Sequence, residues 1–294
     1  MVDDVLFNAI RSRTSAVERI GEHDGIDGIE RIRDAVLVDQ SPIGKSPRSN
    51  PITYVKGFDG IRSLFSSVRE ARMRGYTRST FSFNLPEGRC EMCQGEGAVK
   101  IEMHFMADIY VPCDECFGRR YKQSVLQIRY KGMSIADVLN LTVDEAVELF
   151  RGEAGILPAL YLLQEVGLGY IKLGQPANTL SGGEAQRLKI AREISSGGNT
   201  RMLYIMDEPT TGLHLHDIAN LVTILRKLVR NGNTVLVIEH NLEVVKCADH
   251  VIDLGPEGGD KGGRIVCEGT PEAITRCKRS HTGKLLRKVM DQSK

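Results

Sequence analysis

The chain has 294 residues, 41% of them hydrophobic and 26% charged, with a formal net charge of +1. This length and composition are typical of a globular protein of one or two domains, and the near-zero charge excludes a global attraction to nucleic acid. No apolar run approaches the roughly 20 residues of a membrane span, and Met1-Val2-Asp3-Asp4 does not resemble a signal peptide. We therefore expect a cytoplasmic protein without membrane contact.

The first part of the chain predicts a helix and one strand. Residues 1–34 combine an apolar pattern of helical period with a turn rich in Gly and Asp at 21–28. The apolar run 35–39 is typical of a short buried strand, and a loop follows at 39–51.

Within this loop, Gly44-Lys45-Ser46 nearly matches the phosphate-binding P-loop G-x-x-x-x-G-K-[ST]. However, Asp39 stands where the first glycine belongs, and Pro47 follows the serine, where a P-loop already continues into its helix. We interpret 39–51 as a loop of another kind, so these 294 residues carry an incomplete nucleotide site.

Four of the seven cysteines form a metal-binding pattern. Cys90, Cys93, Cys113 and Cys116 have the spacing C-x₂-C-x₁₉-C-x₂-C, two knuckles at the separation expected of a four-thiolate zinc site. Glycines follow each knuckle and allow the tight turns that direct two sulfurs at one metal. The alternatives are two disulfides or four unrelated thiols, and reducing conditions in a cytosol disfavour disulfides. A site with four sulfur ligands is closed, so we expect a structural zinc ion.

The remaining elements predict a mixed α/β fold. Between the knuckles, 98–103 and 108–111 are typical of a small hairpin. A strand, helix and strand at 202–239 form a βαβ unit, which favours a parallel sheet. The glycine-rich turn 255–263 separates two further strands. The predicted elements are helices around 142–151, 157–166 and 183–195, strand 202–207, helix 214–231, strand 234–239, and short strands at 250–254 and 263–268.

Two segments combine residues suited to nucleotide chemistry. Leu180-Ser181-Gly182-Gly183-Glu184 places a serine and two glycines at the opening of a helix, where backbone N–H groups and the helix dipole can receive a phosphate. The apolar strand 202–207 ends in Asp207, which is placed to hold Mg²⁺, and Glu208 follows, placed to polarise an attacking water.

His240 follows the next strand of the βαβ unit. A lone histidine is usually a packed or surface residue. The carboxyl end of a neighbouring parallel strand is, however, where ligands gather in α/β folds, so His240 is a candidate site residue.

These motifs resemble the signature and Walker B elements of the ABC ATPases, and more specifically the UvrA family of bacterial nucleotide excision repair. The matches extend from about 35 to 275. The segments that carry the resemblance are 39–51, Phe81-Ser82-Phe83-Asn84, Met103-His104-Phe105, Tyr110-Val111-Pro112-Cys113, Asp207-Glu208-Pro209-Thr210-Thr211-Gly212-Leu213-His214 and Asp253-Leu254-Gly255-Pro256-Glu257-Gly258-Gly259. The implied fold class is α/β, an ABC-ATPase-like nucleotide-binding module with a zinc-bearing insertion.

The resemblance also implies roles for individual residues. UvrA proteins carry two ABC modules, and this chain is similar to the C-terminal one after its P-loop. The implied arrangement holds ATP between one module's Walker B face and the signature loop of the other, so a second ABC module or UvrA-like subunit is an expected partner. The implied cofactor-binding residues are Ser181, Gly182, Gly183, Glu184 and Asp207, and the implied catalytic residues are Glu208, His240 and the Q-loop glutamine Gln40. The expected cofactors are structural Zn²⁺ and ATP with Mg²⁺.

Contact with DNA would depend on local basic clusters. The candidates are Arg69, Arg72, Arg74, Arg78, Arg119 and Arg120, with a further basic run near the C-terminus. Each cluster could equally be a solvated helix face. Arginines around a zinc module suit phosphate contacts better than base reading, which fits recognition of duplex deformability. The resemblance implies damaged double-stranded DNA and a UvrB-type repair protein as partners.

The expected domain organisation has four parts: an ATPase core remainder at 1–51, the zinc-bearing insertion at 52–131, the signature region with the Walker B and histidine-switch core at 132–280, and a basic tail at 281–294. Alternative functions are an inactive or split-gene fragment of the same family, an antibiotic-resistance paralogue, a transporter-type ABC subunit, and a DnaJ-like zinc module. A transporter subunit needs no zinc-bearing insertion, and a DnaJ-like module leaves the ABC motifs unexplained.

Overall fold

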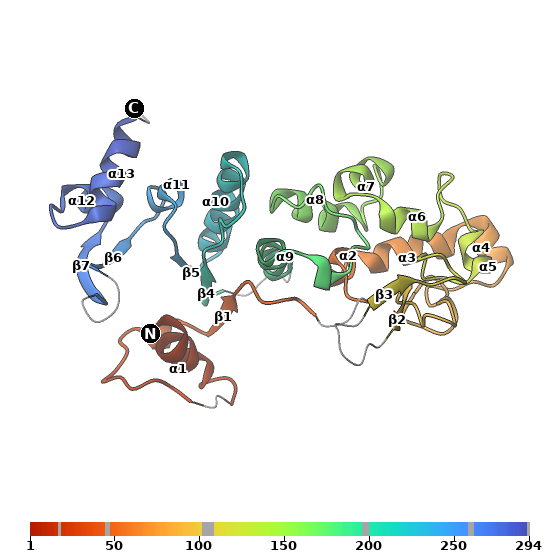
Figure 1. The fold of residues 1–294 in the computed structure, drawn as a ribbon, viewed down its shortest axis with the longest axis horizontal. Helices are drawn as coiled ribbons and strands as arrows, with labels where there is room; N and C mark the ends of the chain where they lie inside the picture. Colours follow the sequence, from red (N-terminus) through yellow and green to blue (C-terminus); the bar gives the residue numbers. More distant parts are fainter. Residues whose placement is uncertain (17–18, 45–47, 102–108, 196–199, 258–261, 293–294) are drawn as a thin grey trace. The chain divides into compact units, whose positions relative to one another are not determined.

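The computed structural model describes residues 1–16, 19–44, 48–101, 109–195, 200–257 and 262–292. The chain forms two compact units, which Figure 1 draws. We call Met1–Asp39 with Asn199–Lys294 the sheet unit, and Gln40–Gly198 the cysteine unit. The P-loop-like residues 45–47, Met103-His104-Phe105 and residues 258–261 lie outside the described residues.

A three-stranded parallel sheet is the centre of the sheet unit. Strand β4 (Met202–Asp207) lies between β1 (Asp34–Val38) and β5 (Thr234–Ile238), with Ala35 opposite Leu203 and Met206 opposite Val237. The first five residues of β4 are all buried, which is the continuous apolar run expected of a central parallel strand. The predicted strands and their parallel pairing are confirmed.

Helix α10 (Leu215–Arg230) connects β4 to β5 and completes the predicted βαβ unit. Its buried apolar residues recur every three or four positions and form one stripe, while the other positions of the helix are mostly polar. The buried residues of this stripe are Ile218, Leu221, Ile224, Leu225 and Leu228.

The C-terminal part of the sheet unit packs around a second small core. Strands β6 (Val251–Gly255) and β7 (Arg264–Gly269) form the predicted antiparallel pair. Helix α13 (His281–Gln292) lies within the predicted basic tail, and its Leu286 is fully buried with Ile274 and Val245. The remaining elements are η1 (Val2–Phe7), α1 (Asn8–Arg11), η2 (Ile29–Arg31), α11 (Leu242–Val245) and α12 (Pro271–Arg276).

The regular elements in the described part of the cysteine unit are mainly helices, together with one pair of strands. Strands β2 (Ala98–Ile101) and β3 (Ile109–Pro112) pair antiparallel, as predicted between the knuckles. The helices are α2 (Pro51–Tyr54), α3 (Phe58–Ser67), α4 (Arg69–Met73), α5 (Gln123–Leu126), α6 (Ile135–Asn140), α7 (Val143–Leu149), α8 (Leu157–Glu165), η3 (Ala177–Thr179) and α9 (Gly182–Ser195).

Aromatic side chains form much of the core of the cysteine unit. Phe83 packs against Phe58 and Tyr121, with ring centroids 5.4 and 6.1 Å away, and Phe65 packs against Phe81 at 5.6 Å. Phe65, Phe81 and Phe83 are fully buried, so these rings stabilise the fold and are not exposed for stacking on bases.

The compact units divide the chain at other positions than the predicted domain boundaries. The insertion 52–131 and the helices up to residue 195 belong to one unit, and hydrogen bonds connect them: Ile52 N–H donates to Leu173 O at 3.3 Å, and the Tyr130 hydroxyl donates to Glu153 Oε1 at 2.9 Å. Among the described residues, none of the helices has the length and apolar character needed to span a bilayer.

Candidate nucleotide, metal and DNA sites

Glu208 and His240, both predicted as catalytic residues, lie side by side in the sheet unit. Glu208 directly follows β4, and His240 follows β5 by one residue. Since these parallel strands are neighbours, their carboxyl ends meet at one edge of the sheet. His240 Nδ1 lies 3.4 Å from Glu208 Oε1, and the two side chains are 79% and 48% exposed. A carboxylate and an imidazole in contact and open to solvent can together act on a water and a phosphate.

The backbone at Glu208 is held in an unusual conformation. Its φ of +44° lies in the left-handed region, which costs a non-glycine residue about 1–3 kcal/mol. Two hydrogen bonds hold it there: Glu208 N–H donates to Ile238 O at 2.9 Å, and Thr211 N–H donates to Glu208 O at 3.1 Å. Asp207 ends β4 one residue earlier with an exposed side chain, opposite Ile238 in the register.

The signature segment begins helix α9, as predicted. Ser181 precedes the helix, and Ser181 N–H donates to Glu184 Oε2 at 2.7 Å while Glu184 N–H donates to Ser181 Oγ at 3.3 Å. This reciprocal pair is a capping box, which orders the first turn and leaves Gly182 and Gly183 at the helix opening. Tyr170 adds a hydrogen bond from its hydroxyl to Glu184 Oε1 at 2.7 Å.

Glu184 is ionised more readily than an ordinary glutamate. Partial burial acts to raise the pKa of its carboxyl, but the hydrogen bonds from Ser181 and Tyr170 outweigh it and hold the pKa below its usual value. The cap is therefore fully formed at neutral pH.

Gln40 packs against the signature segment of its own chain. A Cβ atom added to Gly182 would lie 3.1 Å from Gln40 Oε1 and 3.2 Å from Gln40 Cβ. A side chain at 182 would therefore need Gln40 to shift by a few tenths of an ångström, so the contact favours a glycine there. Gln40 and Gly182 both belong to the cysteine unit, whereas Glu208 and His240 belong to the sheet unit, so a shared catalytic role for Gln40 stays a prediction.

The four predicted zinc ligands come together. Their Sγ atoms all lie within 4.8 Å of one another, with 3.9 Å between Cys90 and Cys113 and 3.7 Å between Cys93 and Cys116. Four sulfurs bound tetrahedrally about 2.3 Å from one Zn²⁺ lie about 3.8 Å apart, so the arrangement fits the ion. These separations are far longer than the roughly 2.05 Å of a disulfide, and all seven cysteines are free thiols.

The two knuckles have the same backbone shape. Residues one, two and four positions after the second cysteine have positive φ in both: Gln94, Gly95 and Gly97 in the first knuckle, and Phe117, Gly118 and Arg120 in the second. This turn directs Gly97 N–H at Cys93 Sγ and Arg120 N–H at Cys116 Sγ, each at 3.3 Å. Such N–H···S contacts orient the sulfurs and stabilise thiolates.

Burial works against ionisation of two of these thiols, Cys90 and Cys116, when no cation is present. It raises the pKa of Cys116 to about 11 and carries the pKa of Cys90 above its ordinary range. A divalent cation would reverse this, because a coordinated thiol is deprotonated. The donor set and spacing therefore fit a closed structural zinc site.

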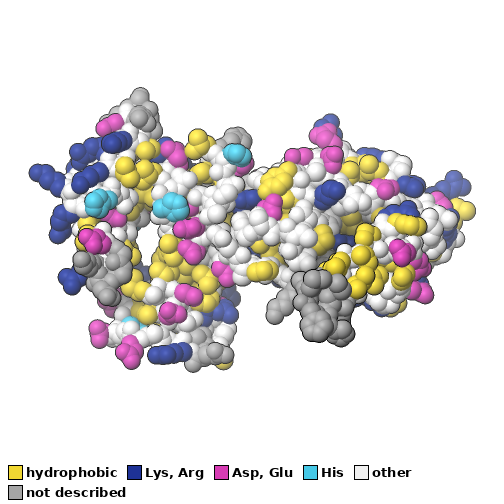
Figure 2. Space-filling model, in the orientation of Figure 1, with side chains coloured by type: hydrophobic (Ala, Val, Ile, Leu, Met, Phe, Trp, Pro, Cys, Tyr) yellow, Lys and Arg dark blue, Asp and Glu magenta, His cyan; other side chains and the backbone are white. Residues whose placement is uncertain are grey.

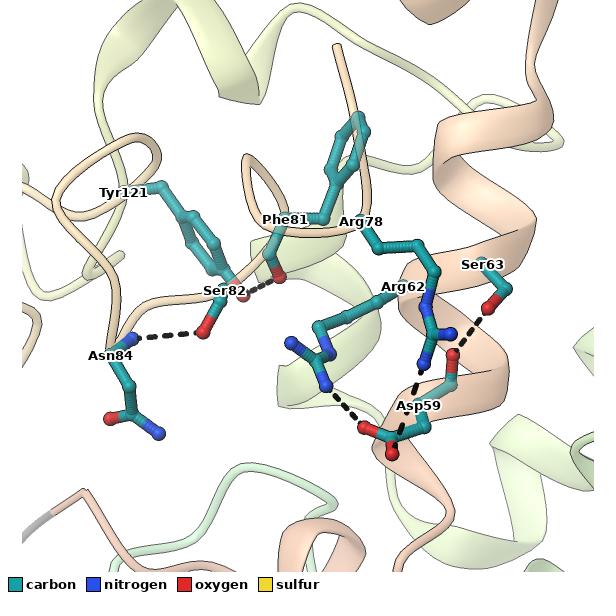
Figure 3. Close-up of polar contacts among 8 residues, drawn as sticks. All are labelled: Asp59, Arg62, Ser63, Arg78, Phe81, Ser82, Asn84 and Tyr121. Atoms are coloured by element: carbon teal, nitrogen blue, oxygen red, sulfur yellow. Dashed lines mark hydrogen bonds and ion pairs between the residues drawn. The ribbon is translucent and has the colours of Figure 1, made fainter.

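Four of the predicted DNA-binding arginines lie on exposed surface in and after α4. Arg69 and Arg72 are exposed, whereas Arg74 pairs with Glu70 at 2.5 Å and donates to Gln127 at 2.7 Å. Arg78 reaches Asp59, where a second arginine also points. Figure 3 shows the guanidinium groups of Arg62 and Arg78 converging on the Asp59 carboxylate.

The two arginines after the second knuckle differ in exposure. Arg119 is partly exposed and borders a cavity of about 290 Å³, which Asn140, Lys172 and Gln175 also line. Arg120 is only 8% exposed, and its guanidinium lies over the Phe83 ring, 5.3 Å from the centroid. Burial lowers the pKa of Arg120, and in this position it stabilises the core beside the knuckles, so a phosphate contact by Arg120 stays a prediction that its burial does not favour.

A basic surface covers the C-terminal helices of the sheet unit. Figure 2 shows Lys and Arg side chains gathered on the end of the sheet unit where α12 and α13 lie. The exposed basic residues there are Arg276, Lys278, Arg279, Lys284, Arg287 and Lys288.

Two residues that bind predicted site residues were not predicted from the sequence. Tyr170 holds Glu184, and Glu239 contacts the loops that carry Glu208 and His240. The sequence signal that could have identified Glu239 is its position directly before His240, at the end of a predicted strand.

Comparisons with known proteins show which proteins the chain is similar to. No family model matches the chain. It is 57% identical over 291 residues to UvrABC system protein A of Aquifex aeolicus, and 54% identical over 291 residues to that of Clostridium perfringens. Each match covers 99% of this chain, which spans about a third (31%) of the length of each relative.

A solved structure shows that the fold is also similar to that of a UvrA protein. The crystal structure of UvrA2 from Deinococcus radiodurans superimposes with a TM-score of 0.81 at 50% sequence identity, covering 88% of this chain and 32% of that chain. By sequence and by fold, the chain is similar to about a third of a UvrA protein, with a mixed α/β fold and a four-cysteine insertion.

Proposed function

We propose that the chain is the C-terminal ATP-hydrolysing module of a UvrA-type protein that recognises damaged DNA in nucleotide excision repair. The contact between Glu208 and His240 carries the proposal, because it joins a general base and a phosphate-contacting group at the edge where α/β folds bind ligands.

Each predicted residue has a defined task in this proposal. Glu208 polarises the attacking water, and His240 contacts the γ-phosphate from the neighbouring strand end. Asp207 would hold Mg²⁺, which supplies charge neutralisation on the phosphates. Ser181, Gly182 and Gly183 present a helix opening to the γ-phosphate of ATP held by a second ABC module.

The 294 residues alone bind ATP weakly in this account. The P-loop lysine and its backbone cradle hold the β- and γ-phosphates, and this sequence contains no such motif. Its relatives are about three times longer, so a P-loop supplied by another part of a UvrA protein would complete the site.

The zinc-binding knuckles and the basic surfaces serve DNA binding rather than ATP hydrolysis. Zinc fixes the two knuckles and thereby the surface around Arg119. Arg69 and Arg72 would contact backbone phosphates of a damaged duplex, and such contacts read shape, not base identity. The relatives carry the name UvrABC system protein A, and we infer a UvrB-type protein as partner and the cytoplasm as the location.

A reconstitution experiment tests the ATPase part of the proposal. The chain is mixed with a separately produced P-loop-bearing portion of a UvrA protein, and phosphate release is measured. We expect turnover only in the mixture and a loss of about 10²–10⁴-fold in Glu208→Gln, the range of a general base. Glu243→Gln removes the same charge from a nearby helix, where Glu243 pairs with Lys246, and it should keep turnover.

A competition experiment tests the DNA part. A fluorescent duplex with a bulky lesion is bound by the same mixture and displaced with unlabelled damaged or undamaged duplex. We expect the damaged competitor to displace it at lower concentration. Equal displacement by both competitors would contradict recognition of damage.

A further inference from the structure

The Glu239 carboxylate connects two loops that leave neighbouring strands. Its Oε1 accepts the Thr210 N–H at 3.0 Å and also the Thr210 hydroxyl. Its Oε2 accepts the N–H groups of His240 and Asn241, each at 2.9 Å. Thr210 lies two residues after Glu208, so one side chain contacts both the loop after β4 and the loop after β5.

We propose that Glu239 is a positioning residue that holds His240 against Glu208. The proposal rests on the ATPase function proposed above and adds a residue that acts through the other two. Glu239 contacts neither the attacking water nor a phosphate in this account.

The geometry of the donors explains why a carboxylate is needed. Four donors, three backbone N–H groups and one hydroxyl, converge on two oxygen atoms, and an ionised carboxylate is the side-chain group that only accepts. Hydrogen bonds to a charged acceptor are about twice as strong as neutral ones. Thr210 is 8% exposed, so its N–H and hydroxyl have little access to water and depend on Glu239.

The exposure of His240 shows what the connection does. The imidazole is 79% exposed, and it contacts the Glu208 carboxylate. Few packing contacts therefore hold the ring, and its place depends on the backbone from which it projects. Glu239 holds that backbone at the His240 N–H and holds the other loop at Thr210, so the Glu208–His240 distance is fixed from both sides.

A purely local role would leave part of this pattern unexplained. Asn241 already begins helix α11, because its Oδ1 accepts the Glu243 N–H at 3.0 Å. The bonds from Glu239 to the His240 and Asn241 N–H groups belong to the same turn. The two bonds to Thr210 do not, since Thr210 follows a different strand, and they make Glu239 a connection between loops.

The first test is a double-mutant cycle read by nuclear magnetic resonance on the whole 294-residue chain. Glu208→Gln removes a charge next to the imidazole, so it should shift the His240 ring-proton resonance. In a Glu239→Gln background we expect this shift to disappear, because the NH₂ group of the amide cannot accept the hydrogen bonds that one carboxylate oxygen accepted, and the ring moves away. Glu243→Gln is the control, and in its background the shift should stay.

Amide hydrogen exchange in the same samples measures the connection directly. Glu239→Gln should speed exchange at Thr210 about tenfold or more, the effect of losing a hydrogen bond to a charged acceptor. Exchange in β4 should stay slow, which would show that the fold is intact. An unchanged His240 shift together with unchanged exchange at Thr210 would overturn the proposal.

Turnover in the reconstituted mixture provides the functional readout. We expect Glu239→Gln to lower kcat about 10²-fold with little change in the KM for ATP, as for a misplaced catalytic group. If wild type itself shows no turnover, the proposed ATPase function fails, while the resonance and exchange results still decide the role of Glu239.

Discussion

His240 Nδ1 lies 3.4 Å from Glu208 Oε1, at the ends of two strands that an entire helix separates in sequence. The register of β4 with β5 produces this contact, because Asp207 lies opposite Ile238 and the chain continues from both strands at the same edge. The pair is therefore formed by the fold of the sheet unit itself, before any nucleotide is present.

Replacing His240 tests its role in turnover. In the reconstituted mixture, His240→Ala should lower kcat about 10²-fold, because a hydrogen-bonding group at the reacting phosphate is lost. Phosphate release measures the effect. The exposed His250 provides a matched control, and His250→Ala should leave the rate unchanged; equal losses in both variants would contradict the assignment.

Zinc should be stoichiometric and necessary for the cysteine unit. Native mass spectrometry should find one Zn²⁺ per chain, and Cys113→Ser should lose it and unfold at a lower temperature, because metal binding contributes folding free energy. Cys247→Ser changes a cysteine outside the cluster and should keep the ion. Zinc retained by Cys113→Ser would contradict the four-thiolate site.

The signature cap should weaken at acidic pH. The folded-state pKa of Glu184 lies below the usual 4.5, so its contribution to stability is complete above that pH and is lost as the pH falls through the lowered value. The contribution of the Glu184 carboxylate is measured by amide exchange at Ser181, compared between wild type and Glu184→Gln. The two proteins should differ at pH 7 and converge at low pH; a constant difference would exclude the carboxylate.

Phosphate contacts by α4 should be visible in the salt dependence of DNA binding. Removing Arg69 and Arg72 together should reduce the slope of log K against log salt by about 2, since each phosphate contact contributes about 0.9. Fluorescence anisotropy over a salt series measures the slope. Arg151 is also exposed but pairs with Glu148, and Arg151→Ala should leave the slope unchanged.

The sequence predicted the elements whose signals are local. The continuous apolar runs of β1 and β4 indicated buried strands, and the structure confirms both strands, with β4 buried and β1 partly buried. The knuckle spacing indicated a four-thiolate cluster, because two residues between cysteines already place two sulfurs on one turn. Ser181 and the following glycines indicated the start of α9, because the signal for a helix start lies within a few neighbouring residues.

Features that depend on contacts between distant segments could not be predicted. Glu239 binds Thr210 only because β4 and β5 are neighbours with a particular register. Arg120 is a basic residue like its partly exposed neighbour Arg119, but it has a positive φ and its guanidinium lies over the Phe83 ring. A basic residue beside a knuckle therefore has two possible environments, and only the folded chain selects one.

The need for a P-loop from elsewhere is tested most directly by calorimetric titration of ATP. The titration is made first with this chain alone and then with the chain mixed with a P-loop-bearing portion of a UvrA protein. We expect weak or undetectable binding by the chain alone and clear binding, followed by turnover, in the mixture. Tight binding and full turnover by the chain alone, or none in the mixture, would contradict a module that completes an ATP site with a P-loop from elsewhere.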